Sequence, residues 1–302
     1  MKSLFVCNIA FLLLLVGFMG ITHHKVPVRT SSYSIRTITN VAYGPKPSEV
    51  LDECLPIGAP SQRPAVIMIH GGGWAGGGKG QWEALCQTYA QNGYDAFTID
   101  YRLTELSTIV APWPDQIGDV QLAVRYIRSI ATTINLDPRR ICSFGDSAGA
   151  HLALLLDTVQ TIDQSDVSYL YPTISPTVLC VADLFGPAEL TRLYNEVPND
   201  RQKLEALLGG QTPTSDPAIY ADASPVSYID SDSGQALIVQ GTKDTTVPPD
   251  QSQLVQTDMQ NAHVPVQYIS YDGGHEFLGL TQTEVDAIFA QIASWYAKML
   301  HP

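Results

Sequence analysis

The chain has 302 residues, of which 45% are hydrophobic, so it can bury the core of one large domain or of two small ones. It carries 17 basic and 30 acidic residues, which gives a formal charge of −13. No run of Lys and Arg exceeds two residues, and this excludes the usual nucleic-acid-binding surfaces. We therefore expect no nucleic-acid partner.

The N-terminal segment differs in composition from the rest of the chain. Lys2 precedes an almost unbroken apolar run over residues 4–21, with small residues at its end. This pattern is typical of a secretory signal, but its length also suffices for a membrane-spanning helix. We predict export to a secreted or periplasmic location. Residues 1–22 would be a signal peptide or an anchor that tethers the protein through 4–21, residues 23–32 a tether, and residues 33–302 one folded domain.

Alternating strand and helix patterns follow along the chain. Short apolar runs bounded by turn residues predict strands, and apolar residues three and four apart predict helices. Strands are predicted over 35–43, 50–57, 64–70, 94–100, 140–144, 177–183, 236–240 and 264–271, and helices over 81–92, 115–132, 150–156 and 282–300. This alternation predicts an α/β fold, a mostly parallel eight-stranded sheet with helices on both faces. The first pair of strands is expected to enter antiparallel.

Four cysteines lie beyond the N-terminal segment. They include no Cys-x-x-Cys pair, so a zinc site is not expected. Cys142 and Cys180 fall within predicted core strands and are expected to be free buried thiols. Cys54 and Cys86 could form a disulfide after export.

The pentapeptide Gly-Asp-Ser-Ala-Gly at 145–149 lies between a predicted strand and a predicted helix. A nucleophilic serine on such a tight turn needs small residues two positions before and after it, where strand and helix approach closely. The start of the helix also directs free N–H groups toward any negative charge that forms there. The alternative is that Ser147 only caps the helix. The motif alone does not decide between the two.

A glycine run, His-Gly-Gly-Gly-Trp at 70–74, follows the third predicted strand. Because glycine has no Cβ atom, the backbone N–H groups of this run can approach a carbonyl oxygen that becomes negative during acyl transfer. The residue after the serine would supply another N–H group. The predicted oxyanion donors are Gly71, Gly72 and Ala148, and the predicted substrate contacts are Trp74 and Asp146.

The same run formally matches the Gly-x-Gly-x-x-Gly motif of dinucleotide-binding proteins, with Asp100 as the acid that would bind the ribose. In those proteins the helix begins within the glycine motif, so that its N-terminus meets the pyrophosphate. Here residues 77–80 separate the motif from the predicted helix. This spacing argues against the dinucleotide alternative.

Two later strands end in loops that carry a carboxylate and an imidazole. Asp244 follows the strand over 236–240, and His275 follows the strand over 264–271, after two glycines. The chain order Ser147, Asp244, His275 is the order found in α/β-hydrolases. We predict that the three side chains form a catalytic triad, with His275 as the base that removes the serine proton.

At this point the chain resembles the hormone-sensitive-lipase and BD-FAE-like esterases of the α/β-hydrolase fold. The motifs that carry the resemblance lie within residues 65–277: HGGGW at 70, DYRL at 100, WPDQIGDV at 113, GDSAG at 145, GTKD at 241 and GGH at 274. The resemblance implies a serine carboxylesterase without a cofactor. It would act on short-chain or aryl esters, such as acetyl or feruloyl esters of small molecules or of polysaccharides.

Two features depart from the resemblance. Glu276 stands where glycine often follows the histidine, and residues 184–234 carry no strand pattern, which predicts a small insertion over the site. An amidase or formamidase of the same fold would use the same triad. A binding module derived from an esterase would have lost a triad member, and all three are present.

Three further residues are predicted to be structural. We expect His151, one helical turn after the serine, to be a packing or capping residue. Arg102 and Asp119 are expected to pair beneath the glycine run and to stabilise it.

Overall fold

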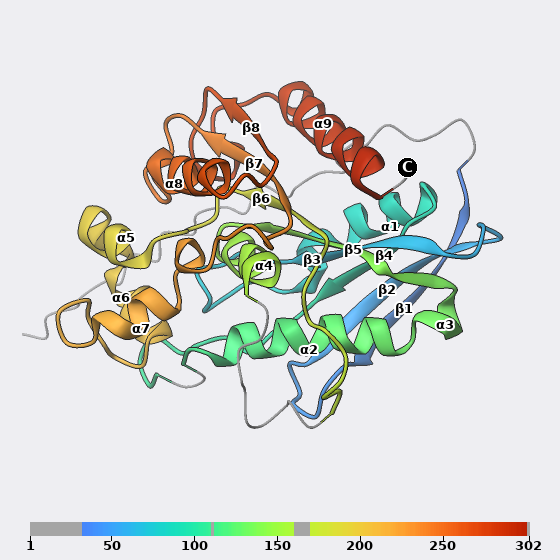
Figure 1. Cartoon of the computed structure of the whole chain (residues 1–302), viewed down its shortest axis with the longest axis horizontal. Helices are drawn as coiled ribbons and strands as arrows, with labels where there is room; N and C mark the ends of the chain where they lie inside the picture. Colours follow the sequence, from blue (N-terminus) through green and yellow to red (C-terminus); the bar gives the residue numbers. More distant parts are fainter. Residues whose placement is uncertain (1–31, 110–111, 160–169, 301–302) are drawn as a thin grey trace, which may run out of the picture.

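A single eight-stranded sheet organises the computed structural model, which describes residues 32–109, 112–159 and 170–300 (Figure 1). Its strand order is β1-β2-β4-β3-β5-β6-β7-β8. The sheet is mostly parallel with an antiparallel first pair, as predicted; β2 is also antiparallel to its other neighbour, β4, and every remaining neighbouring pair is parallel. The strands are β1 (Ser34–Ala42), β2 (Val50–Ile57), β3 (Arg63–Ile69), β4 (Asp95–Ile99), β5 (Leu136–Asp146), β6 (Cys180–Leu184), β7 (Gln235–Gly241) and β8 (Val266–Tyr271).

The four predicted helices are present, but α8 (Pro249–Asn261), a 13-residue helix between β7 and β8, was not among them. The long helix predicted over 115–132 ends early and is followed by a separate turn of helix. Residues 185–234 form only short helices and no strand, which agrees with the missing strand pattern. The α-helices are α1 (Glu83–Gln91), α2 (Asp115–Ser129), α3 (Ala131–Ile134), α4 (Ala148–Thr158), α5 (Leu190–Glu196), α6 (Arg201–Leu207), α7 (Pro217–Asp222), α8 (Pro249–Asn261) and α9 (Gln282–Leu300), and the 3-10 turns are η1 (Lys79–Trp82), η2 (Pro198–Asp200), η3 (Pro225–Ser227) and η4 (His275–Phe277).

The predictions for residues 1–22 and for nearly all of 23–32 fall outside the described residues. Within the part of the chain that the structure describes, no helix is both long and apolar enough to cross a membrane.

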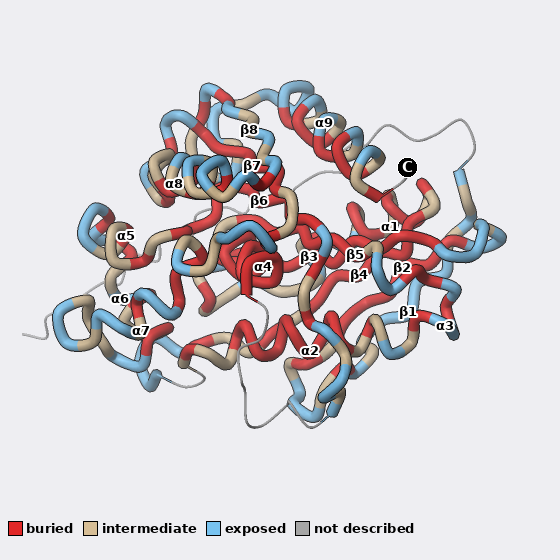
Figure 2. The backbone as a smooth tube through the Cα atoms, in the orientation of Figure 1, coloured by how far each residue is buried: buried red, intermediate tan, exposed pale blue. Residues whose placement is uncertain are grey.

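The inner strands β3, β4 and β6 are buried at every position because helices cover both faces of the sheet. In β3, Ala65, Ile67 and Ile69 face the core beneath α2, α4 and α8, whereas Val66 and Met68 face the core beneath α1 and α9. Figure 2 shows the result, with β3, β4, β6 and α4 buried throughout. Burying each large aliphatic side chain contributes about 1.5–3 kcal/mol, so this two-sided core holds the strand ends in fixed positions.

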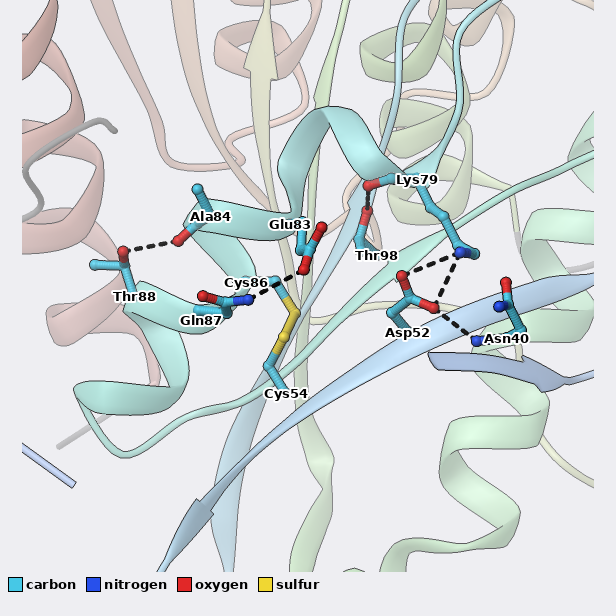
Figure 3. Close-up of a disulfide and its surroundings, with 10 residues drawn as sticks. All are labelled: Asn40, Asp52, Cys54, Lys79, Glu83, Ala84, Cys86, Gln87, Thr88 and Thr98. Carbon is cyan, nitrogen blue, oxygen red and sulfur yellow. Dashed lines mark hydrogen bonds and ion pairs between the residues drawn. A yellow bond between two sulfur atoms is a disulfide. The ribbon is translucent and has the colours of Figure 1, made fainter. Parts of the chain in front are cut away.

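The four described cysteines form two disulfides. Cys54 of β2 is bonded to Cys86 of α1, a pairing that the sequence left open (Figure 3). The prediction that Cys142 and Cys180 are free thiols is wrong, because they are bonded to each other. These two residues lie directly opposite each other on the parallel neighbours β5 and β6. Their pairing depends on strand order and register, which cysteine spacing in the sequence does not show.

The loop after the glycine run, which contains Lys79, is hydrogen-bonded to β2 and β4 close to the Cys54–Cys86 disulfide (Figure 3). Lys79 Nζ lies 3.1 Å from Asp52 Oδ2, and Thr98 Oγ1 donates to the Lys79 carbonyl at 2.7 Å. The Lys79 N–H donates to Asp100 Oδ1 at 2.6 Å. Asp100 therefore holds this loop, and α1 begins only at Glu83. Neither feature matches a dinucleotide site, where the acid is free and the helix starts within the glycines.

Arg102 and Asp119 pair as predicted. Arg102 donates from its backbone N–H, Nε and Nη2 to the Asp119 carboxylate at 2.6–3.0 Å, and its Nη1 lies 2.8 Å from Asp115 Oδ2. Burial raises the pKa of Asp119 to about 6, although Arg102 opposes this shift. The pair therefore lies in a poorly solvated position between the start of α2 and the loop after β4.

Replacing Arg102 with methionine should lower the free energy of unfolding by about 3 kcal/mol, because the buried Asp119 carboxylate loses its charged partner. Urea denaturation at pH 8 measures this difference. Arg139→Met is the matched control, since the Arg139 side chain is 84% exposed in its pair with Asp137 and should contribute little. Equal stability of the two variants would show that the Arg102 pair is not a stabilising element.

Candidate active site

Ser147 stands on a sharp turn between β5 and α4, with φ 51° and ψ −121°. A Cβ atom at Gly145 would lie 2.3 Å from the Gly149 carbonyl oxygen, and a Cβ atom at Gly149 would lie 2.2 Å from the Ile69 carbonyl oxygen. The two glycines are therefore required by close backbone approach, which is the reason given for them from the sequence. A serine at positive φ is strained and persists because the surrounding backbone fixes it.

The three side chains predicted to act together meet at the carboxyl ends of the parallel strands. His275 Nε2 lies 3.0 Å from Ser147 Oγ, and His275 Nδ1 lies 2.7 Å from Asp244 Oδ2. The carboxylate accepts only, so Nδ1 carries the proton and Nε2 is free to accept one from the serine hydroxyl. This arrangement can transfer the serine proton to the imidazole during nucleophilic attack.

Asp244 and His275 are held by two loops that fit closely together. Asp244 Oδ1 accepts the N–H groups of Thr246 and Val247, both at 2.9 Å. The Lys243 N–H donates to the Gly273 carbonyl at 2.9 Å, which joins the loop after β7 to the loop after β8.

The imidazole is also held from one side. The ring of Phe185 meets the His275 ring edge to face, with centroids 4.8 Å apart. The imidazole therefore has little freedom to turn away from the serine.

The structure changes the predicted set of oxyanion donors. The Gly71 N–H donates to Asp146 Oδ1 at 2.9 Å, so it is not available to a substrate, and the expectation for Gly71 is wrong. Gly72, Gly73 and Ala148 line the cavity beside the serine. Among the described residues, the N–H groups of Gly72 and Gly73 have no acceptor. Gly73 was part of the glycine motif but was not singled out from the sequence.

Asp146 does not line the cavity, so its position does not support the predicted contact with substrate. Its buried carboxylate accepts hydrogen bonds from the Gly71 N–H, Gln81 Nε2 and Trp82 Nε1 at 2.8–2.9 Å. Burial raises the pKa of Asp146 to about 6, against the effect of these three donors. We conclude that Asp146 fixes the glycine run to the serine turn.

Two replacements of Asp146 should separate its charge from its hydrogen bonds. Asp146→Ala releases Gly71 and should lower kcat about tenfold, because the neighbouring amides move. Asp146→Asn keeps an acceptor for Gly71 and should retain most of the activity. Steady-state kinetics on 4-nitrophenyl acetate distinguish the two results. Equal loss in both variants would contradict the role assigned to these bonds.

The same residue predicts a dependence of stability on pH. The pKa of Asp146 is about 6 in the folded protein, against a usual value of 3.8. Its contribution to stability is fully present below its unfolded pKa and is lost as the pH rises through about 6. The Asn variant lacks this titration, so its stability relative to the wild type should rise by about 3 kcal/mol between pH 4 and pH 7. A difference that does not change with pH would contradict this.

A cavity of about 150 Å³ opens at Ser147. Trp74, the predicted substrate contact, lines it, and so does the exposed Glu276. The insertion covers one side, as predicted, and contributes four residues that no sequence motif identified: Pro187, Leu193, Asp200 and Lys203. Thr246 and Val247 complete the wall beside the carboxylate loop.

Two of the insertion residues bring charge into the cavity. Lys203 Nζ lies 2.8 Å from Asp200 Oδ1, so the cation and the carboxylate form an ion pair in the wall. The Lys203 side chain also covers Gly73, since a Cβ atom at Gly73 would lie 2.9 Å from Lys203 Cδ. No local pattern in the sequence indicated this, because the contact forms only when the insertion folds back over the glycine run.

Comparison with known proteins places this geometry in a family. The profile of the BD-FAE family matches residues 51–259. The chain belongs to the BD-FAE family. Its α/β-hydrolase fold agrees with the prediction from the motifs, and the relatives and solved structures that it resembles are named as esterases or carboxylic ester hydrolases.

Curated relatives of the chain include two mycobacterial proteins. It is 27% identical over 290 residues to Esterase LipQ of Mycobacterium tuberculosis, covering 94% of this chain and 67% of that protein. It is 30% identical over 208 residues to the probable carboxylic ester hydrolase LipM of the same organism, and the match covers 68% of this chain and 47% of LipM. The chain thus spans about half to two thirds of the length of these relatives.

Solved structures show the same fold. A truncated carbohydrate esterase from gut microbiota superposes with a TM-score of 0.71 at 25% identity, covering 91% of this chain and 99% of that one. A propionate-bound thermophilic esterase of Thermogutta terrifontis gives a TM-score of 0.71 at 23% identity, covering 90% and 96%.

Proposed function

We propose that this chain is a serine carboxylesterase that works through an acyl-enzyme. The observation that carries the proposal is the position of His275, within hydrogen-bonding distance of both Ser147 and Asp244. Ser147 Oγ attacks the ester carbonyl carbon while its proton passes to His275 Nε2. The tetrahedral intermediate then collapses, the C–O bond to the alcohol breaks, and the imidazolium protonates the departing oxygen. Water repeats the sequence on the acyl-enzyme, with His275 again as the base.

The negative oxygen of the tetrahedral intermediate is assigned to the N–H groups of Gly72, Gly73 and Ala148. Gly71 is left out because its N–H group is bound to Asp146. Ala148 is the first residue of α4, so its N–H group has no partner within the helix. Each donor of this kind contributes about 3 kcal/mol to transition-state stabilisation.

The size of the cavity supports esters of short acids. A cavity of about 150 Å³ holds a molecule of roughly the size of benzene, with about six non-hydrogen atoms. Acetyl, propionyl and butyryl groups fit this volume, and a feruloyl group exceeds it. Of the two substrate classes expected from the sequence, we therefore propose the short-chain esters.

The charged residues that line the cavity indicate that the alcohol part of the ester is polar. Lys203, Asp200 and Glu276 present hydrogen-bonding groups at a cavity whose other walls are largely apolar. Glu276 is exposed and the Lys203 side chain is 40% exposed, so both can contact a hydroxyl-rich alcohol, such as a sugar, that extends out of the cavity, whereas a long alkyl chain cannot satisfy them. The similarity to a carbohydrate esterase agrees with this assignment. We propose acetylated sugars or polysaccharides as the natural substrate class.

We also propose that the protein is exported. Its four described cysteines form two disulfides, and such bonds form and persist in oxidising compartments. Export agrees with the apolar run over residues 4–21.

A panel of substrates tests the proposed specificity. The value of kcat/KM should be highest for 4-nitrophenyl acetate to butyrate, should fall for the octanoate, and should be low for methyl ferulate. Release of acetate from acetylated xylan should accompany the activity on short esters. Faster hydrolysis of the octanoate or of methyl ferulate would contradict the short-acyl assignment. An aryl formamide cleaved faster than the matching ester would move the enzyme to the amidase class.

A further inference from the structure

His151 joins the glycine run to the insertion through two hydrogen bonds. It lies on α4 one turn after Ser147, and it is fully buried. Trp74 Nε1 donates to His151 Nδ1 at 3.2 Å, and His151 Nε2 lies 2.7 Å from the Ala223 carbonyl oxygen. Any buried imidazole needs hydrogen-bond partners, and those of His151 come from two segments that lie far from α4 in the sequence.

The two partners fix the protonation state of the ring. The indole N–H of Trp74 can only donate, so Nδ1 of His151 must accept and carries no proton. The Ala223 carbonyl can only accept, so Nε2 must carry the proton. Burial agrees with a neutral ring, since it lowers the pKa of His151 to about 4. His151 therefore acts as a rigid connector with an acceptor at one end and a donor at the other.

Trp74 links His151 to the cavity beside Ser147. It follows Gly73 directly, lines the cavity, and has a φ of 58°, which is strained for a residue with a side chain. The Thr104 N–H donates to its carbonyl at 2.9 Å, and His151 accepts its indole N–H. The first bond holds the backbone of Trp74 and the second holds its side chain, and together they restrict the orientation of the preceding peptide groups.

At its other end the connector contacts the insertion. Ala223 caps the C-terminus of α7, and the adjacent Asp222 accepts a hydrogen bond from Trp113 Nε1 at 2.7 Å. The insertion also supplies part of the cavity wall beside Ser147. His151 therefore fixes the glycine run and the insertion to the same turn of α4.

We propose that His151 is a positioning residue, which holds Trp74 so that the amides of Gly72 and Gly73 stay directed at the oxyanion. This inference rests on the proposed function, because it takes the oxyanion donors from it. It predicts that the bond to Trp74 affects the chemical step, whereas the bond to Ala223 affects mainly stability.

Two substitutions separate the two bonds. Asn places its side-chain oxygen where Nδ1 lies, so His151→Asn can still accept from Trp74 but does not reach Ala223. Gln places its amide nitrogen where Nε2 lies, so His151→Gln keeps the donor for Ala223 and loses the acceptor for Trp74. Both variants should melt at a lower temperature than the wild type. Only His151→Gln should lower kcat, by about 10-fold to 100-fold, with little change in KM.

A transition-state analogue provides a readout that a merely structural role would not change. A trifluoromethyl ketone adds to the serine and forms an oxyanion, so its inhibition constant should rise in His151→Gln by the same factor as kcat/KM falls. Trp74→Phe removes the donor from the other side and should lower kcat similarly. The double variant Trp74→Phe/His151→Gln should show no further loss.

Several results would overturn the inference. A wild-type kcat in His151→Gln would do so, and so would equal losses in the Asn and Gln variants. If the His151 variants do not fold, an unchanged kcat and inhibition constant in Trp74→Phe would have the same effect. Failure of the proposed function looks different, because the wild-type protein would then not hydrolyse 4-nitrophenyl acetate at all.

Discussion

Replacing Ser147 with alanine is expected to lower kcat for 4-nitrophenyl acetate by about 10⁵-fold, with little change in the melting temperature. The substitution removes the only oxygen that lies within hydrogen-bonding distance of His275 Nε2 among the described residues. No acyl-enzyme can then form, and only the weak assistance of the oxyanion donors to attack by water remains. Steady-state kinetics and thermal melting on the same preparation measure both quantities.

Ser143→Ala is the matched control, because it makes the same change four residues earlier in β5. The Ser143 hydroxyl is buried and donates to the Ala153 carbonyl at 3.1 Å, away from the cavity. This variant should lose some stability and keep its kcat. If Ser147→Ala kept the activity, or if Ser143→Ala lost it to the same extent, the nucleophile would have to be sought elsewhere.

Asp244→Asn should lower kcat by about 10⁴-fold without unfolding the protein. The amide oxygen can still accept from the N–H groups of Thr246 and Val247, so the amide nitrogen turns toward His275. That nitrogen donates, which forces His275 Nδ1 to accept and moves the ring proton to Nε2. A protonated Nε2 cannot take the proton of Ser147, so the loss follows from the wrong tautomer.

The matched control is Asp272→Asn in the neighbouring loop. The Asp272 side chain is 80% exposed and pairs with Lys243 at 2.7 Å. An exposed pair of this kind contributes little, so kcat and stability should stay close to those of the wild type. A modest decrease in Asp244→Asn, similar to that of the control, would show that the carboxylate does not set the tautomer of His275.

The sequence was sufficient for the parts of the site that depend on local constraints. The glycines at 145 and 149 were predicted from the crowding of a strand-to-helix turn, and the structure shows that crowding. Asp244 and His275 each follow a predicted strand of a mostly parallel sheet, and this position predicts their role. Parallel strands bring their carboxyl ends to one edge, so residues far apart in sequence come together there.

The predictions that were wrong involve contacts between segments with no local relationship. The Gly71 N–H was assigned to the oxyanion, but it is bound to Asp146, 75 residues further along the chain. Cys142 and Cys180 pair because β5 and β6 are neighbours in register. Hydrophobic patterns predict that such strands exist but do not determine their order and register.

The contacts of the insertion could not be predicted from local sequence patterns either. Lys203 reaches the cavity only because short helices fold back over the glycine run, and nothing near it in the sequence distinguishes it from a surface lysine. The link from Trp74 through His151 to Ala223 was missed for the same reason. Each hydrogen bond in it spans more than 70 residues of sequence.

The most direct test of the central claim is to identify the residue that a fluorophosphonate modifies. The claim is that the hydroxyl of Ser147, activated by His275, is the nucleophile. Peptide mass spectrometry of the inactivated protein should find one adduct, on Ser147, with activity lost in proportion to labelling and no adduct in Ser147→Ala. Activity that survives complete labelling of Ser147, or inactivation with the adduct on another residue, would contradict the claim.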